Sequence, residues 1–313
     1  MSDSDSEHID SDSENIDPNP VNEDPGPVID FARVGNPFLH VAGDGPSYGS
    51  YEECYEYFRL KVVKVAEVWA ILPNKAGDPH QVKSAKQFRE MFSTDNYSEK
   101  NKKGQFVNKP FIGRFMKEGK LNTDRVFWEF GMYPDPCACP PDVFNLWTPF
   151  AVESITAEGD FVPRIDNLAF VLRHLFILSG RSKVLYDHTL DWVSHLFQYP
   201  DIKSHMLCFI GAHGCGKSMI FGDTEFGPGL LANMMGKSKF FTTAEPEKYV
   251  WGNFNSLMRD AYLVNLNEVG NFTHVGYNNK GVGQLKALIK GKEITINDKG
   301  LSHVKTQSLA KYV

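Results

Sequence analysis

The sequence Met206-Leu-Cys-Phe-Ile210, followed by Gly211-Ala-His-Gly-Cys-Gly216-Lys217-Ser218, decides the fold class. Its second part fits the pattern G-x-x-x-x-G-K-[ST], between an apolar run that predicts a strand and a short run that predicts a helix. Glycines let such a loop wrap so that successive backbone N–H groups face phosphate oxygens. We therefore predict a phosphate-binding loop in an α/β domain. The alternative is a glycine-rich turn that carries a lysine by coincidence.

The loop is expected to bind ATP together with Mg²⁺. Lys217 would reach the β- and γ-phosphates, the Ser218 hydroxyl would bind the metal, and the start of the following helix would add its positive dipole. The predicted nucleotide-binding residues are Gly211, Ala212, His213, Gly214, Cys215, Gly216, Lys217 and Ser218.

An apolar strand that ends in an acid follows downstream, Ala261-Tyr-Leu-Val-Asn-Leu266-Asn267-Glu268. A P-loop ATPase needs an acid that holds hydrated Mg²⁺ and a glutamate that polarises the attacking water. We therefore predict Lys217 and Glu268 as catalytic residues, and Ser218, Asn267 and Glu268 as the Mg²⁺ site. Asn267 stands where such strands usually carry an acid, so it supplies an oxygen but no charge. The alternative is a sheet strand that ends in an exposed glutamate.

The end of the sequence predicts a helix over 283–290, a strand over 293–296 and a turn at Asn297-Asp-Lys-Gly300. This order favours a hairpin with Lys299 at its tip. Lysines on a helix and at a hairpin tip can contact DNA phosphates, so we predict DNA binding by Lys286 and Lys299. Exposed turns often carry a lysine, and that is the alternative.

Charge is distributed unevenly along the chain. Its 313 residues hold 33 Lys and Arg against 39 Asp and Glu, but residues 1–30 hold ten acids and no Lys or Arg. The body is therefore mildly basic, which is compatible with nucleic-acid binding, and 1–30 is expected to be a disordered acidic tail. No apolar run is long enough to span a bilayer, and the polar N-terminus lacks a signal peptide. We expect an intracellular chain, in nucleus or cytoplasm, with no membrane segment.

The region before the loop predicts a helix over Tyr51–Val65, a strand over Val65–Leu72 and a helix over 84–92 with Ser84 as N-cap. Helical spacing over 165–179 indicates a largely buried helix that holds His174 in the packing, and a second helix follows over 186–198.

Residues 99–120 carry seven bases interleaved with Phe106, Phe111 and Phe115. They either hold single strands by stacking or form a solvated loop and an amphipathic helix, and we favour the second interpretation.

Four regions follow from these patterns. They are a disordered tail (1–30), an α+β region (31–150), a helical region (151–200) and the P-loop ATPase domain (201–313).

Taken in order, these elements resemble the superfamily 3 helicase domain of phage and viral primase-polymerases. The resemblance covers roughly residues 50–313, and the phosphate loop alone is shared with P-loop NTPases in general. The matching residues are Phe130 with Pro134, Phe144-Asn-Leu-Trp147, Leu190-Asp-Trp192, Gly211–Ser218, Asn253-Phe-Asn255, Asn265–Glu268, Leu285-Lys286 and Ile294–Gly300.

The resemblance implies an AAA+-like core in a homo-hexameric ring that hydrolyses ATP and moves single-stranded DNA, with a primase or polymerase acting in trans. Lys299 would lie on the loop that tracks DNA. The family continues with a sensor strand, between the loop strand and the Glu268 strand, and then an arginine finger. Neither is visible up to Val313, so the core is expected to be incomplete and to bind ATP better than it hydrolyses it.

Two other functions remain open. A nucleotide kinase would need lid arginines, and Arg259 is the only arginine after Ser218. A non-catalytic DNA-binding or interaction protein could keep the helicase shape without its turnover.

Overall fold

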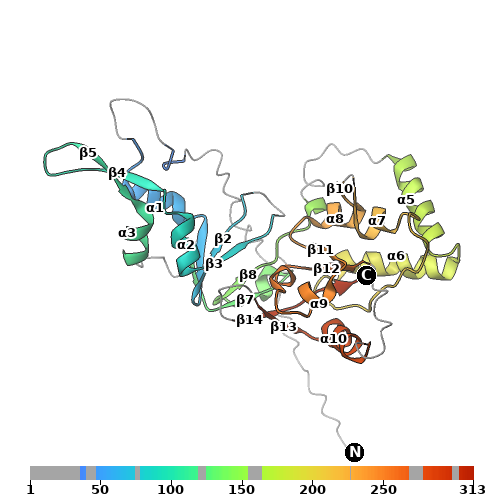
Figure 1. Cartoon of the computed structure of the whole chain (residues 1–313). Helices are drawn as coiled ribbons and strands as arrows, with labels where there is room; N and C mark the ends of the chain where they lie inside the picture. Colours follow the sequence, from blue (N-terminus) through green and yellow to red (C-terminus); the bar gives the residue numbers. More distant parts are fainter. Residues whose placement is uncertain are drawn as a thin grey trace, which may run out of the picture. The chain divides into compact units, whose positions relative to one another are not determined.

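The computed structural model describes residues 36–39, 47–74, 78–118, 125–153, 164–225, 227–267, 278–297 and 303–313. The chain divides into two compact units, Met1–Gly35 and Asn36–Val313, and the fold below belongs to the second. It is a mixed α/β fold with several small sheets (Figure 1). The predicted acidic tail lies outside the described residues. Within those residues, none of the helices has the length and apolar character needed to cross a bilayer.

The N-terminal part of this unit contains three helices, α1 (Tyr51–Arg59), α2 (Ala85–Met91) and α3 (Phe111–Glu118). The predicted Ser84 N-cap is confirmed, because its side chain accepts from the Gln87 N–H while Gln87 bonds back to Ser84. Ser50 and Glu53 cap α1 in the same way. The helices enclose a core that we call the aromatic cluster, made of Tyr51, Cys54, Phe58, Val62, Trp69, Phe88, Tyr97, Phe111, Ile112 and Phe115.

The helix predicted over Tyr51–Val65 is too long, because β1 (Val62–Val65) takes its second half. Valines favour strands, and β1 pairs antiparallel with β2 (Val68–Ile71) around a tight turn in which Ala66 has a φ of 48°. β3 (Gln81–Ser84) pairs with β2, and β6 (Val126–Phe127) runs parallel to β1. The sheet order is β3-β2-β1-β6.

This sheet separates two cores. Side chains alternate between its faces, so Val62 and Trp69 enter the aromatic cluster while Val63, Val65 and Ala70 join the main hydrophobic core. The main core continues to residues as distant as Tyr262 and Val313.

Residues 99–120, predicted as a loop and a helix, contain a hairpin before the helix. β4 (Asn96–Lys100) pairs antiparallel with β5 (Phe106–Pro110). The predicted helix is confirmed as α3. The sequence missed β5 because its side chains are mostly exposed and give no apolar alternation.

Two long helices, α5 (Ile165–Leu178) and α6 (Lys183–Gln198), confirm the helices predicted before the loop. The expected burial of α5 is wrong. Leu175 is its only buried residue, whereas Ile165 and Phe170 are 77% and 60% exposed. Periodicity identifies an apolar face but not whether another element covers it.

A parallel sheet lies beside these helices, in the order β11 (Phe240–Thr243), β12 (Leu263–Leu266) and β15 (Lys311–Tyr312). β12 confirms the strand predicted before Glu268. Four short elements precede β11: α7 (Lys217–Phe221), β9 (Asp223–Thr224), β10 (Gly227–Pro228) and α8 (Leu230–Met235). Between β11 and β12 lie α9 (Pro246–Tyr249) and η3 (Ser256–Met258).

The predicted C-terminal hairpin is confirmed, since β13 (Glu293–Ile296) pairs antiparallel with β14 (Val304–Gln307) after helix α10 (Asn278–Lys290). Its turn lies outside the described residues. β14 also pairs with β7 (Glu129–Gly131), which pairs with β8 (Val143–Asn145), and the 3-10 turn η2 (Pro136–Ala138) lies between those two. One sheet therefore joins residues 129–145 to residues 293–307.

Candidate functional site

The conformation of the loop Gly211–Ser218 depends on two glycines. Gly214 and Gly216 have φ values of 77° and 84°, in the left-handed region that side chains rarely adopt. At Gly216 a Cβ atom would also lie 2.6 Å from Nε2 of His174. The loop can keep this shape only with glycine at position 216.

The loop offers unused hydrogen-bond donors. Within the part of the chain that the structure describes, the backbone N–H groups of residues 212–216 donate to no acceptor. The Lys217 ammonium folds back over the loop, 3.2 Å from the Gly211 carbonyl oxygen and 3.1 Å from that of Ala212. Both carbonyls are exposed, so an anion with stronger acceptors can displace these contacts.

The segment before the loop is not the strand that the sequence predicts. Residues 206–210 form no strand, and among the described residues one backbone hydrogen bond joins them to the sheet, from the Leu207 N–H to the Tyr312 carbonyl at 3.2 Å. Leu207 is buried, and the side chain of Ile210 is fully exposed.

A strand does lie at the position expected to be empty, between the 206–210 segment and β12. β15 pairs parallel with β12, with Leu263 opposite Lys311, and its other edge accepts the Leu207 bond. Residues 311–312 therefore lie between the 206–210 segment and β12. The expectation that nothing in this chain fills that position is wrong, and it failed because two paired residues give no periodic signal.

Helix α7 packs directly on β12. A Cβ atom at Gly222, the residue that ends α7, would come within 2.9 Å of the Asn265 amide nitrogen and 3.1 Å of Ser218 Cα. Asn265 donates in turn to Thr242 on β11. The structure thus brings Ser218 close to the middle of β12. Because α7 has five residues, the backbone donors and Lys217 contribute more to anion binding than its dipole does.

His174 is a contact that the sequence did not assign to the loop. Its Nε2 lies 3.1 Å from the Gly216 carbonyl oxygen, and its ring stacks parallel to Phe170. It was predicted as a packing histidine, and it does pack, but against the loop. The available signal in the sequence was the position of His174 among the apolar residues of α5.

The other predicted site residues are placed as follows. Asn267 follows β12, is exposed and donates its backbone N–H to Thr243. Lys286 is exposed on α10. Glu268 and Lys299 lie outside the described residues, so the structure brings Ser218 and the β12 strand together but does not describe the predicted water-activating glutamate or the hairpin tip.

Two asparagines of the sequence motifs hold neighbouring elements in place. The Asn145 side chain accepts from the Tyr133 and Trp147 N–H groups. Buried Asn255 donates to the Thr295 carbonyl and accepts from the Asn297 N–H, which fixes the end of β13. These asparagines position neighbouring elements, a role that sequence spacing did not reveal.

Two lysines are buried in and beside the parallel sheet. Lys311 donates to the Pro200 carbonyl and the Tyr262 hydroxyl, and burial lowers its pKa to about 7. Lys239 donates to Thr148 and lies 4.1 Å from the centre of the Trp147 ring, and burial lowers its pKa to about 8. Burial therefore disfavours the charged form of both amines.

Comparison with known proteins gives a family match and structural matches. Residues 209–313 match a family described as a family of unknown function, DUF5906. No curated protein matches the chain. The chain is similar to an apo structure of the C-terminal region of NrS-1, with 16% identity and a TM-score of 0.51 over 80% of this chain and 52% of that one. An A-form apo structure of the same region gives 14% identity and a TM-score of 0.49 over the same shares.

The chain spans about half the length of these NrS-1 structures. At this identity the likeness concerns the fold. The family match begins at Phe209, two residues before the glycine loop, and continues through β15.

Proposed function

We propose that Gly211–Ser218 bind ATP with Mg²⁺, and that the chain belongs to a replication protein of the helicase type. The observation that carries this proposal is the loop itself. Two left-handed glycines, a run of unused backbone N–H donors and the Lys217 ammonium meet in one exposed loop. Successive N–H groups in such a turn form a concave anion site, and a nearby lysine adds charge.

The residues present fit the nucleotide. Lys217 would exchange the carbonyls of Gly211 and Ala212 for phosphate oxygens, and the Ser218 hydroxyl would face the metal. Bound Mg²⁺ neutralises phosphate charge. Asn267 supplies an uncharged oxygen for a metal-bound water, and we propose Glu268 as the residue that activates the attacking water.

For these 313 residues we propose nucleotide binding rather than efficient ATP hydrolysis. Arg259, the only arginine after the loop, donates to Asp260 and to the His80 carbonyl, and its side chain is 11% exposed. Its guanidinium is therefore already engaged by these two partners. An arginine supplied in trans raises turnover by several orders of magnitude, so hydrolysis would need one from elsewhere. The same observation disfavours a nucleotide kinase with lid arginines.

The proposal extends to partners. Lys286 on α10 and Lys299 beyond β13 would contact single-stranded DNA. Helix α5 contacts the loop through His174 and carries exposed apolar residues. These residues support association with further copies of this chain, as in a hexamer. A primase or polymerase would act in trans.

Titration with a fluorescent ATP analogue and Mg²⁺ tests the nucleotide site. Lys217→Ala removes the charge that meets the phosphates, and we expect binding to fall by at least about tenfold. Lys248→Ala, an exposed lysine paired with Glu245, is the matched control and should bind like the unmodified chain. Equal binding by all three proteins would refute the proposal.

A further inference from the structure

The β4–β5 hairpin stands apart from the other sheets. Its strands pair with each other from Asn96–Pro110 to Lys100–Phe106, and no third strand joins them within the described residues (Figure 1). Most side chains of β5 are exposed. A two-stranded ribbon of this kind has no core of its own, so its surface is available to a partner.

The tip of the hairpin is ordered by its own hydrogen bonds. The Asn101 side-chain oxygen accepts from the backbone N–H of Lys103 at 2.8 Å and of Gln105 at 3.1 Å. Gly104 has a φ of 80° and open space where a Cβ would be. Because the tip is already fixed, a ligand would not have to order it on binding.

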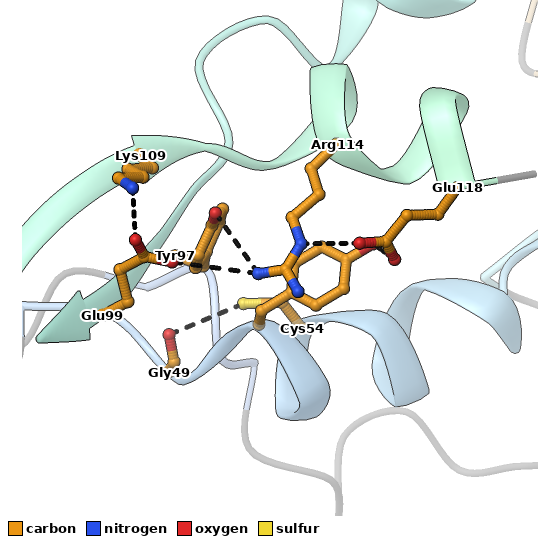
Figure 2. A network of polar contacts seen from close by, with 8 residues as sticks. Gly49, Cys54, Tyr97, Glu99, Lys109, Arg114 and Glu118 are labelled. Carbon is orange, nitrogen blue, oxygen red and sulfur yellow. Dashed lines mark hydrogen bonds and ion pairs between the residues drawn. The ribbon is translucent and has the colours of Figure 1, made fainter.

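The charge on this hairpin is strongly positive. Residues 96–110 contain four lysines and one acid, Glu99. Glu99 is paired with Lys109 and lies 3.8 Å from the Arg114 guanidinium, as Figure 2 shows. The hydrogen bond from Lys109 is the main cause that lowers the pKa of the Glu99 carboxyl. The charge of this acid is thus compensated by Lys109 and Arg114.

Three lysines remain toward the tip, Lys100, Lys102 and Lys103. All are exposed, and within the described part of the chain no carboxylate lies within ion-pair distance of them. Phe106 is opposite Lys100, whose ammonium lies 5.2 Å from the ring centre, and the ring is 46% exposed. Phe111 and Phe115, the other two aromatic residues of 99–120, are buried in the aromatic cluster.

The base of the hairpin is anchored. Buried Ser98 donates to Asn108 across the strands and accepts from the Tyr48 N–H. The Arg114 guanidinium lies 3.6 Å from the centre of the Tyr51 ring and donates to Glu118 at 2.7 Å. The lysines are therefore presented on a rigid arm held by the aromatic cluster.

We propose that the β4–β5 hairpin binds single-stranded nucleic acid, with phosphates on Lys100, Lys102 and Lys103 and an unpaired base stacked on Phe106. Lysines beside an exposed aromatic ring combine the two interactions that hold single strands without sequence preference. A duplex has no unpaired base to offer the ring, so the arm prefers a single strand. This site is separate from the glycine loop and does not depend on nucleotide binding.

The test uses the full chain and a fluorescent oligo-thymidylate, without nucleotide, over a series of salt concentrations. The triple variant Lys100→Ala, Lys102→Ala, Lys103→Ala should lower the slope of log affinity against log salt by about 2, because each lost single-strand phosphate contact removes about 0.7. Phe106→Ala should weaken binding by roughly 5-fold to 100-fold with the slope unchanged, and Phe106→Trp should restore it.

The matched control removes three exposed lysines elsewhere, Lys86, Lys183 and Lys248, each paired with an acid. It changes the net charge equally and should keep the salt slope. Equal losses in the two triple variants would overturn the proposal. So would equal affinity for a duplex of the same length, or loss of binding to anionic lipid vesicles without loss of oligonucleotide binding. Lys217→Ala should leave this binding intact, which separates it from the nucleotide site.

Discussion

The aromatic N-terminal region and the parallel-sheet region are built in opposite ways. In the first, α1 and α2 begin at complete capping boxes and β4 pairs with its neighbour β5. In the second, β11, β12 and β15 come from distant parts of the chain, and α7, α8 and α9 begin without a side-chain cap hydrogen bond. The first region is specified locally, and the second depends on long-range pairing and encloses two buried lysines, Lys239 and Lys311.

The largest effect should come from removing one ring of the aromatic cluster. Phe58 is 2% exposed, and its ring centre lies 4.8 to 5.1 Å from those of Phe92, Phe115 and Phe111. Phe58→Ala should lower the free energy of unfolding by about 3–5 kcal/mol, measured by urea denaturation. Exposed Phe106→Ala is the control and should change it by less than about 0.5 kcal/mol. A similar small change at Phe58 would show that the cluster contributes little.

The parallel sheet should instead respond to pH. Unfolded Lys311 regains its usual pKa of 10.5, whereas burial holds the folded value at about 7 beside Lys203 and Asp201. Between these values the unfolded state binds more protons, so the free energy of unfolding should rise with pH. Lys311→Met should reduce this rise by about 1 kcal/mol per pH unit, as followed by urea denaturation from about pH 7 to pH 9.

Lys239 and Lys203 have lowered pKa values from burial as well, so part of the rise should persist in that variant. Lys248→Met, at an exposed lysine, should leave the slope unchanged. If Lys311→Met behaves like this control, Lys311 is charged in the folded protein and the account of the sheet is wrong.

The contrast between local and long-range contacts also explains which elements the sequence predicted. Ser84, the helix 165–179 and the apolar residues 263–266 give local signals, and the corresponding elements are present. Parallel pairing of β15 with β12 joins residues that no local pattern connects, and it was missed. So was the exposure of α5, because burial depends on neighbours. In the site, the glycine pattern predicted the loop, but the contact with His174 depends on how α5 packs.

A smaller effect should come from the caps. Ser84→Ala removes the side chain that accepts from the Gln87 N–H, and it should cost about 1 kcal/mol of unfolding free energy. Ser182→Ala on α6 should cost less, because its bond to the Leu185 N–H is longer, 3.5 Å, and has no reciprocal partner. Thermal unfolding of both variants measures the difference. Equal costs would mean that the shorter side-chain bond at Ser84 contributes no more than the longer one at Ser182.

Amide hydrogen exchange with and without ATP·Mg²⁺ tests the central claim most directly, because it shows where the nucleotide binds. We expect slower exchange at the backbone N–H groups of residues 212–216, which donate to no acceptor within the described part of the free chain, and unchanged exchange over residues 47–118. In Lys217→Ala the slowing should be lost. Unchanged exchange in the loop, or slowing confined to another region, would contradict the assignment of Gly211–Ser218 as the nucleotide site.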